Sequence, residues 1–256
     1  MRRVIFNQKG GVGKSTITCN LAAISAARGR RVLVLDLDPQ GNSTRYLLGH
    51  NPENPTETLA GFFKEMLSFS FNNKGIVGYI HPTPFDGLFL MAAHPELEDQ
   101  QVKLEARYKM FKLRDALLAL EGYDEIYIDT PPALNFFTRS ALIAANACLI
   151  PFDCDDFSRQ ALYAVLANVQ EIQQDHNDQL EIEGIIVNQF QSRARLPKAL
   201  VEELIGEGLP ILGTYLSPSI RIRESHQNAK PMIHFDPRHK LTGEFQALYD
   251  ALGNPV

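Results

Sequence analysis

The chain has few cysteines, and they are not arranged for metal binding or for disulfides. Only three occur among its 256 residues, and no two of them form a C-x-x-C pair. An odd number with irregular spacing excludes a disulfide framework and a structural zinc site, and it is typical of a protein from a reducing cytosol. The same lack argues against an iron–sulfur carrier, which needs several thiolates around one cluster. The three cysteines are Cys19, Cys148 and Cys154.

Long hydrophobic runs and an excess of positive charge are missing as well. No stretch reaches the roughly 18 consecutive apolar residues that indicate a membrane-spanning helix, and the N-terminus enters a predicted strand without a signal peptide. The net charge is −5, so bulk charge does not predict binding to nucleic acid. The histidines lack metal-ligand spacing, and we expect His226, His234 and His239 at surface or loop positions. These absences predict a cytoplasmic protein.

Apolar segments of strand length alternate with segments of helical spacing along the chain. Continuous apolar strands separated by helices indicate a parallel sheet that helices cover on both faces. Because we find no repeat and no linker, we expect residues 1–256 to form a single α/β domain, doubly wound and mostly parallel. Strands are expected near residues 4–6, 31–36, 88–92, 125–129, 148–152, 182–187 and 210–213. Helices are expected near residues 57–67, 96–121, 136–146, 158–175, 196–206 and 240–252.

A glycine-rich loop lies between the first predicted strand and a run of helical spacing that ends at Gly29. It reads K-G-G-V-G-K-S-T over residues 9–16. Glycines let the backbone turn tightly and bring its N–H groups against phosphate oxygens, at the N-terminus of the following helix. In such a loop Lys14 reaches the β- and γ-phosphates, and Ser15 offers its hydroxyl to Mg²⁺. The predicted phosphate-binding residues are Lys9, Gly10, Gly11, Val12, Gly13, Lys14, Ser15 and Thr16.

The loop departs from the common G-x4-G-K-[ST] pattern at its first position, where Gln8 replaces glycine. A second lysine, Lys9, stands at the loop entrance, ahead of Lys14. One loop has little need of two lysines for one triphosphate. We therefore predict that Lys9 contacts a phosphate bound by a second subunit.

Aspartates follow two of the predicted strands. Asp129 ends an apolar strand, which is the arrangement in which a carboxylate holds Mg²⁺ beside a phosphate loop. Asp36 and Asp38 follow the second strand, and alternation places them on the same side of an extended chain. We predict that Asp38 orients the attacking water, and that Asp36 contacts the loop or the water shell of the metal. The candidate metal residues are Ser15, Asp36 and Asp129, and the candidate catalytic residues are Lys9, Lys14 and Asp38.

Together these segments resemble the ParA/MinD group of ATPases with a deviant Walker A loop, and the ParA branch more than the MinD branch. The resemblance is carried by N-Q-K-G-G-V-G-K-S-T at 7–16, D-L-D-P-Q-G-N at 36–42 and D-T-P-P at 129–132. A fourth segment, R-I-R-E-S-H at 221–226 followed by Lys230 and Pro231, is similar to the late region of the family. These segments span most of the chain, and the first two are highly specific.

The resemblance implies a cycle that depends on ATP and Mg²⁺. ATP closes two subunits into a homodimer in which Lys9 of each touches the phosphates of the other. The dimer binds DNA of the nucleoid without sequence preference, and a cargo-bound partner stimulates hydrolysis, which is otherwise slow, and releases it. Relatives contact adenine near the positions of Asn188, Ser217 and Pro218. The resemblance leaves open whether the cargo is DNA or a protein assembly.

Two departures from the family pattern fall near these predicted sites. Leu216-Ser217-Pro218 stands where relatives often read I-P-R. Asp153 stands where relatives usually carry glutamine, and Asp155 and Asp156 follow closely. The three aspartates fit either a partner-specific face or an ordinary solvated strand end.

Positive charge is concentrated late in the chain. Residues 193–240 carry eight basic and five acidic side chains, a local charge of +3 that leaves −8 for the remainder. Such asymmetry is typical of a phosphate-binding face on an acidic protein. Arg193 and Arg195 are the first candidates for contact with DNA; Arg221 and Arg223 are the second, with the nucleotide site or the dimer interface as their alternative. The candidate DNA-binding residues are Arg193, Arg195, Lys198, Arg221 and Arg223.

Two other functions are compatible with the phosphate loop. A MinD-like protein needs a basic amphipathic C-terminal helix that lies on the membrane. Here Leu241, Phe245, Leu248 and Leu252 have core spacing, and the polar face carries little positive charge, so we expect packing on the sheet and no stable membrane anchoring. A metabolic kinase or ligase needs a pocket for a second small substrate, and the sequence identifies none.

Overall fold

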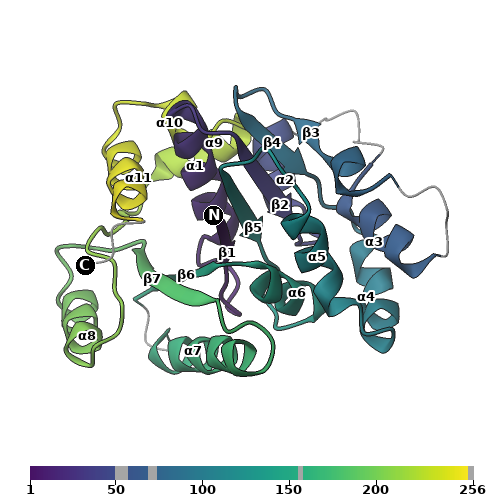
Figure 1. The fold of residues 1–256 in the computed structure, drawn as a ribbon. Helices are drawn as coiled ribbons and strands as arrows, with labels where there is room; N and C mark the ends of the chain where they lie inside the picture. Colours follow the sequence, from purple (N-terminus) through teal and green to yellow (C-terminus); the bar gives the residue numbers. More distant parts are fainter. Residues whose placement is uncertain (50–56, 69–73, 155–157, 253–256) are drawn as a thin grey trace.

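The computed structural model describes residues 1–49, 57–68, 74–154 and 158–252. Its centre is a seven-stranded sheet in the order β3-β4-β2-β5-β1-β6-β7 (Figure 1). Neighbouring strands run parallel, apart from β3, which is antiparallel to β4. The predicted mostly parallel sheet is thereby confirmed. The strands are β1 (Arg2–Ile5), β2 (Val32–Asp36), β3 (His81–Pro82), β4 (Leu88–Met91), β5 (Glu125–Asp129), β6 (Ala147–Asp153) and β7 (Glu181–Asn188).

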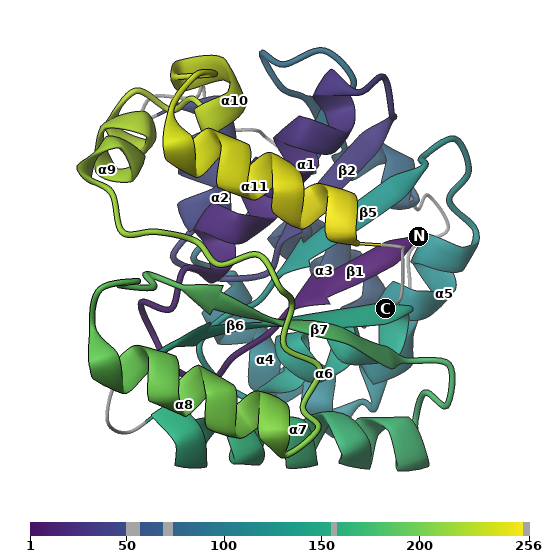
Figure 2. The ribbon, with the colours of Figure 1, turned by 90° about the vertical axis from the view of Figure 1, so that its left-hand side faces the viewer.

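Helices cover both faces of the sheet, because successive strand residues point to opposite sides. In β1, Val4 packs into the apolar layer formed with α3 to α8, whereas Ile5 packs into the layer formed with α1, α2, α10 and α11. Figure 2 shows α11 on one side of the sheet and α7 and α8 on the other. The helices are α1 (Lys14–Ala27), α2 (Asn42–Leu48), α3 (Leu59–Leu67), α4 (Leu97–Ala106), α5 (Lys112–Leu118), α6 (Phe136–Ala144), α7 (Ser158–Asp175), α8 (Arg195–Gly206), α9 (Ile220–Gln227), α10 (Met232–Phe235) and α11 (Lys240–Ala251).

Two predicted elements are wrong. The single helix expected over 96–121 is two helices, α4 and α5, because Tyr108 takes a left-handed conformation with φ of 52° and ends the first of them. The strand expected at 210–213 is only a one-residue bridge between Ile211 and Ile185 at the edge of β7. The described part of the chain contains no helix with the length and apolar character to cross a bilayer.

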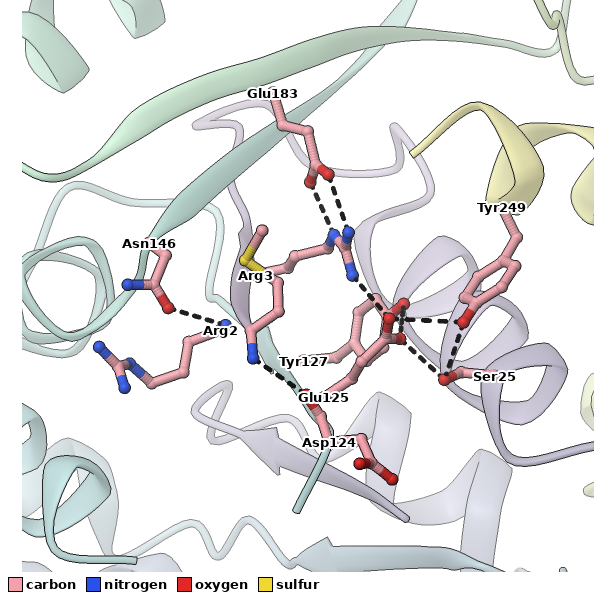
Figure 3. A network of polar contacts seen from close by, with 10 residues as sticks. Arg2, Arg3, Ser25, Asp124, Glu125, Tyr127, Asn146, Glu183 and Tyr249 are labelled. Carbon is pink, nitrogen blue, oxygen red and sulfur yellow. Dashed lines mark hydrogen bonds and ion pairs between the residues drawn. The ribbon is translucent and has the colours of Figure 1, made fainter. Parts of the chain in front are cut away.

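A buried polar network ties the sheet to two helices at the amino ends of the strands (Figure 3). Arg3 donates from Nε and Nη2 to the carboxylate of Glu183 at 2.7 and 2.9 Å, and its Nη1 lies 3.2 Å from Oε1 of Glu125. Glu125 also accepts from the hydroxyls of Ser25 in α1 and Tyr249 in α11, at 2.7 and 3.4 Å. The buried guanidinium is therefore paired with two carboxylates, as a buried charge requires.

Candidate functional site

The carboxyl ends of the parallel strands meet at one edge of the sheet, where ligands bind in folds of this class. The register pairs Asp36 at the end of β2 with Asp129 at the end of β5, and Asp129 with Ile5 at the end of β1. On the other side, Asp153 at the end of β6 pairs with Asn188 at the end of β7. Because the phosphate loop follows β1, the strand order places it between Asp129 and Asp153.

The backbone of the loop is held in a conformation that glycine permits. Gly11 and Gly13 have φ angles of 78° and 91°, which residues with a Cβ rarely adopt. Asn7 ties the loop to β6, since its Nδ2 donates to the carbonyl of Pro151 at 2.7 Å and its Oδ1 accepts from the N–H of Lys9 at 2.9 Å. Helix α1 begins directly after the loop, so its first N–H groups favour an anion there.

Replacing Gly13 with alanine is expected to lower the free energy of unfolding by about 1–3 kcal/mol, because alanine is strained at this φ. An added Cβ would also lie 2.4 Å from Nδ2 of Asn188. Gly10→Ala is the matched control, because a Cβ at Gly10 meets no described atom within 4 Å. Urea unfolding without nucleotide measures the difference, and equal stability of the two variants would contradict the prediction.

Lys14 lies buried where the loop meets the first turn of α1. The residue is 7% exposed, and its Nζ donates to the carbonyl of Lys9 at 3.0 Å. Burial lowers the pKa of Lys14, and the nearby carboxylates of Asp129 and Asp38 raise it. An ammonium group in this position can exchange one carbonyl oxygen for phosphate oxygens, to which it binds more strongly.

Asp129 presents a carboxylate oxygen that no described protein group satisfies. Its Oδ2 accepts from the hydroxyl of Ser43 at 2.7 Å, whereas its buried Oδ1 has no hydrogen-bond partner among the described residues. Burial raises the pKa of Asp129, and the nearby hydroxyls of Ser15 and Ser43 lower it. A buried oxygen of this kind fits a Mg²⁺ ion or one of its water ligands.

Asp36 has both carboxylate oxygens engaged by the protein. Its Oδ2 accepts from the N–H and the hydroxyl of Thr44 at 2.7 and 2.8 Å, and its Oδ1 accepts from the N–H of Asp38 at 3.3 Å. Burial, and then the neighbouring Asp129, raise the pKa of Asp36. These contacts are neither of the two roles predicted for Asp36, because they fix the start of α2 and the turn at Asp38 and do not reach the phosphate loop.

Asp38 lies in a tight turn between β2 and α2. It is 6% exposed, and its Oδ1 accepts from the N–H of Gln40 at 3.0 Å. The turn closes with a bond from the N–H of Gly41 to the carbonyl of Asp38 at 2.8 Å. Asp38 thus keeps carboxylate acceptor capacity, and its negative charge raises the pKa of Lys14.

Lys9 contacts a carboxylate of its own chain. Its Nζ lies 3.0 Å and 3.2 Å from the two carboxylate oxygens of Asp153. The Lys9 side chain keeps 32% of its surface exposed, so it remains accessible at the loop entrance. Asp153 is therefore a counterion of Lys9, a role that the sequence did not predict for it. Asp155 and Asp156 lie outside the described residues.

A cavity of about 560 Å³ opens beside the phosphate loop. It brings together the three residues predicted near adenine, although they lie far from the loop in sequence. Asn188 also donates from Nδ2 to the carbonyl of Val12 at 2.9 Å. The volume is in the usual range for small-molecule sites. Residues that line the cavity include Gly11, Gly13, Thr16, Asn188, Ser217, Pro218 and Arg223.

The basic candidates fall into two groups. Arg193, Arg195 and Lys198 are exposed around the start of α8. Arg221 instead lies between carboxylates, with its Nη2 2.9 Å from Oδ2 of Asp236 and its Nη1 bonded to Glu224. The interpretation of Arg221 as a DNA contact does not fit this geometry, because its charge is already matched. Arg223 lines the cavity beside the loop, which favours the alternative role at the nucleotide site.

Comparison with known proteins decides the family. A family model described as an AAA domain matches residues 3–182. The chromosome partitioning protein ParA of Myxococcus xanthus is 36% identical over 247 residues, which cover 95% of this chain and 84% of that protein. The chain belongs to the ParA family of ATPases. The resemblance stated from the sequence motifs is thereby confirmed over most of the chain.

Solved structures share the fold of this ParA-family chain. McdA from Cyanothece aligns with a TM-score of 0.85 and 23% identity, covering 98% of this chain and 99% of that chain. Cobyrinic acid a,c-diamide synthase from Mycobacterium smegmatis, bound to an ATP analogue and magnesium, aligns with a TM-score of 0.80 and 25% identity over 97% and 92% of the two chains. That synthase therefore binds an ATP analogue and magnesium on the same fold.

Sequence reasoning missed three residues around the ParA-type loop. Ser43 and Thr44 bond to the two strand-end aspartates, and the only signal for them was that hydroxyl residues follow Asn42. His226 was expected at a surface or loop position, but it lies half-buried in α9, with its Nε2 3.0 Å from Oγ1 of Thr16. No spacing rule predicts this contact, because the two residues are 210 positions apart.

Proposed function

We propose that this ParA-family ATPase closes into a homodimer on ATP, binds DNA without sequence preference and positions a cargo through partner-stimulated hydrolysis. The observation that carries the proposal is the meeting of a two-lysine phosphate loop with Asp38 and Asp129 at one sheet edge. We further propose that residues 1–256 act as one domain, in the cytoplasm and on the nucleoid. Pull-down with the slow-hydrolysing variant Asp38→Ala would identify the cargo-bound partner.

The residues present fit ATP and Mg²⁺. Lys14 and Thr16 would hold phosphates, Ser15 and Asp129 would hold the metal, and the cavity at Asn188 would take the adenine. Among the residues that the structure describes, no three His, Cys, Asp or Glu side chains form a metal cage. This suits Mg²⁺, which keeps several waters and uses phosphate oxygens as ligands. When bound, the metal neutralises charge that develops on the phosphates.

Dimerisation is proposed to depend on Lys9. The side chain stands at the loop entrance and pairs with Asp153 in the single chain. In the proposed dimer its ammonium leaves this carboxylate for the triphosphate of the other subunit. A triphosphate carries more negative charge than one carboxylate, so the exchange favours association only when ATP is present.

Changing Arg193 and Arg195 together to alanine is expected to weaken binding to random-sequence DNA about tenfold or more at fixed salt. The slope of log affinity against log salt is expected to fall by about one for each phosphate that the variant no longer neutralises. Fluorescence anisotropy with ATP, and separately with ADP, measures both quantities. ATP affinity should stay unchanged, because neither residue lines the cavity.

Arg221→Ala is the matched control for the DNA experiment. It removes one arginine, against two in the double variant, and that arginine is held by Asp236 and Glu224, so DNA affinity should change little. An equal weakening of DNA binding in the control and the double variant would overturn the choice of surface. If the wild-type protein binds DNA neither with ATP nor with ADP, the proposal that it binds DNA is wrong.

The environment of α11 supports a DNA-bound rather than a membrane-bound role. Leu241, Phe245 and Leu248 of this helix are buried in the apolar layer that also contains residues of α1. A helix that lies on lipid needs a free apolar face, and here that face is covered by the chain itself. We therefore do not propose a MinD-like membrane anchor.

A further inference from the structure

His226 lies between the phosphate loop and the helix that follows Asp38. Its Nε2 is 3.0 Å from the hydroxyl oxygen of Thr16, which lines the cavity beside the loop. Its ring stacks on Tyr46 of α2, with the ring centroids 3.8 Å apart and the planes inclined by 13°. One imidazole on α9 therefore contacts both α1 and α2.

Hydrogen bonds next to the ring hold its neighbours in place. The hydroxyl of Tyr46 lies 2.8 Å from Oγ of Ser225, the residue before His226, and it accepts from Nδ2 of Asn20 at 3.3 Å. Oδ1 of the same Asn20 accepts from the N–H of Met232 at 2.8 Å, at the start of α10. Four helices thus share one polar cluster, which fixes the Tyr46 ring on which the imidazole stacks.

The imidazole is neutral at neutral pH. Burial lowers the pKa of His226 to about 4. A neutral imidazole carries one N–H, on either Nδ1 or Nε2. The tautomer therefore decides whether the ring donates a hydrogen bond to Thr16 or accepts one from it.

The two tautomers leave the Thr16 hydroxyl in opposite states, because a hydroxyl has one hydrogen to donate. If Nε2 accepts that hydrogen, only the lone pairs of Thr16 face the cavity, and they repel a phosphate. If Nε2 carries the N–H, it donates to the hydroxyl oxygen, and the hydroxyl hydrogen can point at a phosphate. An anion in the site therefore selects the tautomer with the proton on Nε2.

We propose that His226 is a positioning residue of the nucleotide site, which donates from Nε2 to Thr16 and turns the Thr16 hydroxyl toward a phosphate of the bound nucleotide. The inference rests on the proposed function, since it requires a nucleotide in the cavity. The imidazole is already held on Tyr46 before the nucleotide binds, so orienting it costs little conformational entropy on binding. It also makes α9 part of the support of the phosphate loop.

Titration of the complete chain with a fluorescent ADP analogue tests the role without relying on hydrolysis. His226→Phe keeps an aromatic ring for the stack on Tyr46 but has no donor, and it is expected to raise the Kd about tenfold. His226→Gln and His226→Met form a second comparison, because they are similar in size and only glutamine has an N–H. Nucleotide affinity should be close to wild type with glutamine and weakened with methionine.

A double-mutant cycle with Thr16→Val separates positioning from a general effect on the fold. If His226 acts through the hydroxyl, His226→Phe weakens binding no further in the Thr16→Val background. An equal effect of His226→Phe in both backgrounds, or wild-type affinity in both His226→Phe and His226→Met, would overturn the inference alone. Wild-type protein that binds no nucleotide would overturn the proposed function as well.

Discussion

Lys9→Gln is expected to abolish ATP-dependent dimerisation while leaving ATP binding by the single chain intact. Lys14 and the loop backbone would hold the phosphates within one subunit, so the substitution removes the contact proposed to cross the interface, together with the ion pair to Asp153 in the single chain. Removing one partner of a buried charge pair at an interface costs about 2–5 kcal/mol, which raises the dimer dissociation constant roughly 30-fold or more. Sedimentation with a non-hydrolysable ATP analogue measures that constant.

Asp153→Asn is the matched control for Lys9, because it removes the other half of the same ion pair. With the ion pair to Asp153 removed, Lys9 is expected to cross to the second subunit more readily, so this variant should dimerise at least as well as the wild type. If Lys9→Gln weakens dimerisation and Asp153→Asn does not, Lys9 acts across the interface. If both variants weaken it, the ion pair only stabilises the single chain. Lys9→Gln protein that dimerises like the wild type would refute the bridge.

Asp38→Asn is expected to lower ATP hydrolysis, both alone and with the activating partner, by about 10²–10⁴-fold. Asp38 is buried close to Lys14, and the other aspartate of this segment is not available because Thr44 occupies it. Asparagine keeps an acceptor for the N–H of Gln40, so the turn should survive. Phosphate release measures the rate, and nucleotide titration should show unchanged affinity.

The same variant should accumulate as the ATP-bound dimer, because association precedes hydrolysis in the proposed cycle. Asp36→Asn is its control, since it neutralises a carboxylate that bonds to the start of α2. We expect Asp36→Asn to alter stability, and Asp38→Asn to alter rate. If Asp38→Asn hydrolyses ATP at the wild-type rate, Asp38 has no role in hydrolysis.

Local sequence predicted the elements whose signals lie within a few residues. The phosphate loop, the aspartates at the ends of β2 and β5, and most strands depend on glycine spacing and continuous apolar runs, so they were predictable. Helix α2 was missed because it has only seven residues, Asn42–Leu48, too few for a periodic pattern. The break at Tyr108 was missed because its left-handed conformation is unusual for a residue with a Cβ.

The rest of the site depends on contacts between distant segments, which a single sequence does not contain. The partner of Lys9 is 144 positions away, and Arg221 is matched by Asp236 only after α10 has turned the chain back. Arg221 and Arg193 count equally in the local charge of residues 193–240, although of these two only Arg221 is held between carboxylates. Composition identified the basic region, but only the folded structure shows which of its side chains are exposed for contact with DNA.

The polar network at the amino ends of the strands constrains how the chain responds to nucleotide. Ser25, near the far end of α1, bonds to Glu125 and receives a bond from Tyr249. A rigid-body tilt of α1 would have to separate these buried groups, and with them the arginine that they surround. We therefore expect shape changes during the cycle to occur mainly in the turns at the carboxyl ends of the strands, and this network to move little.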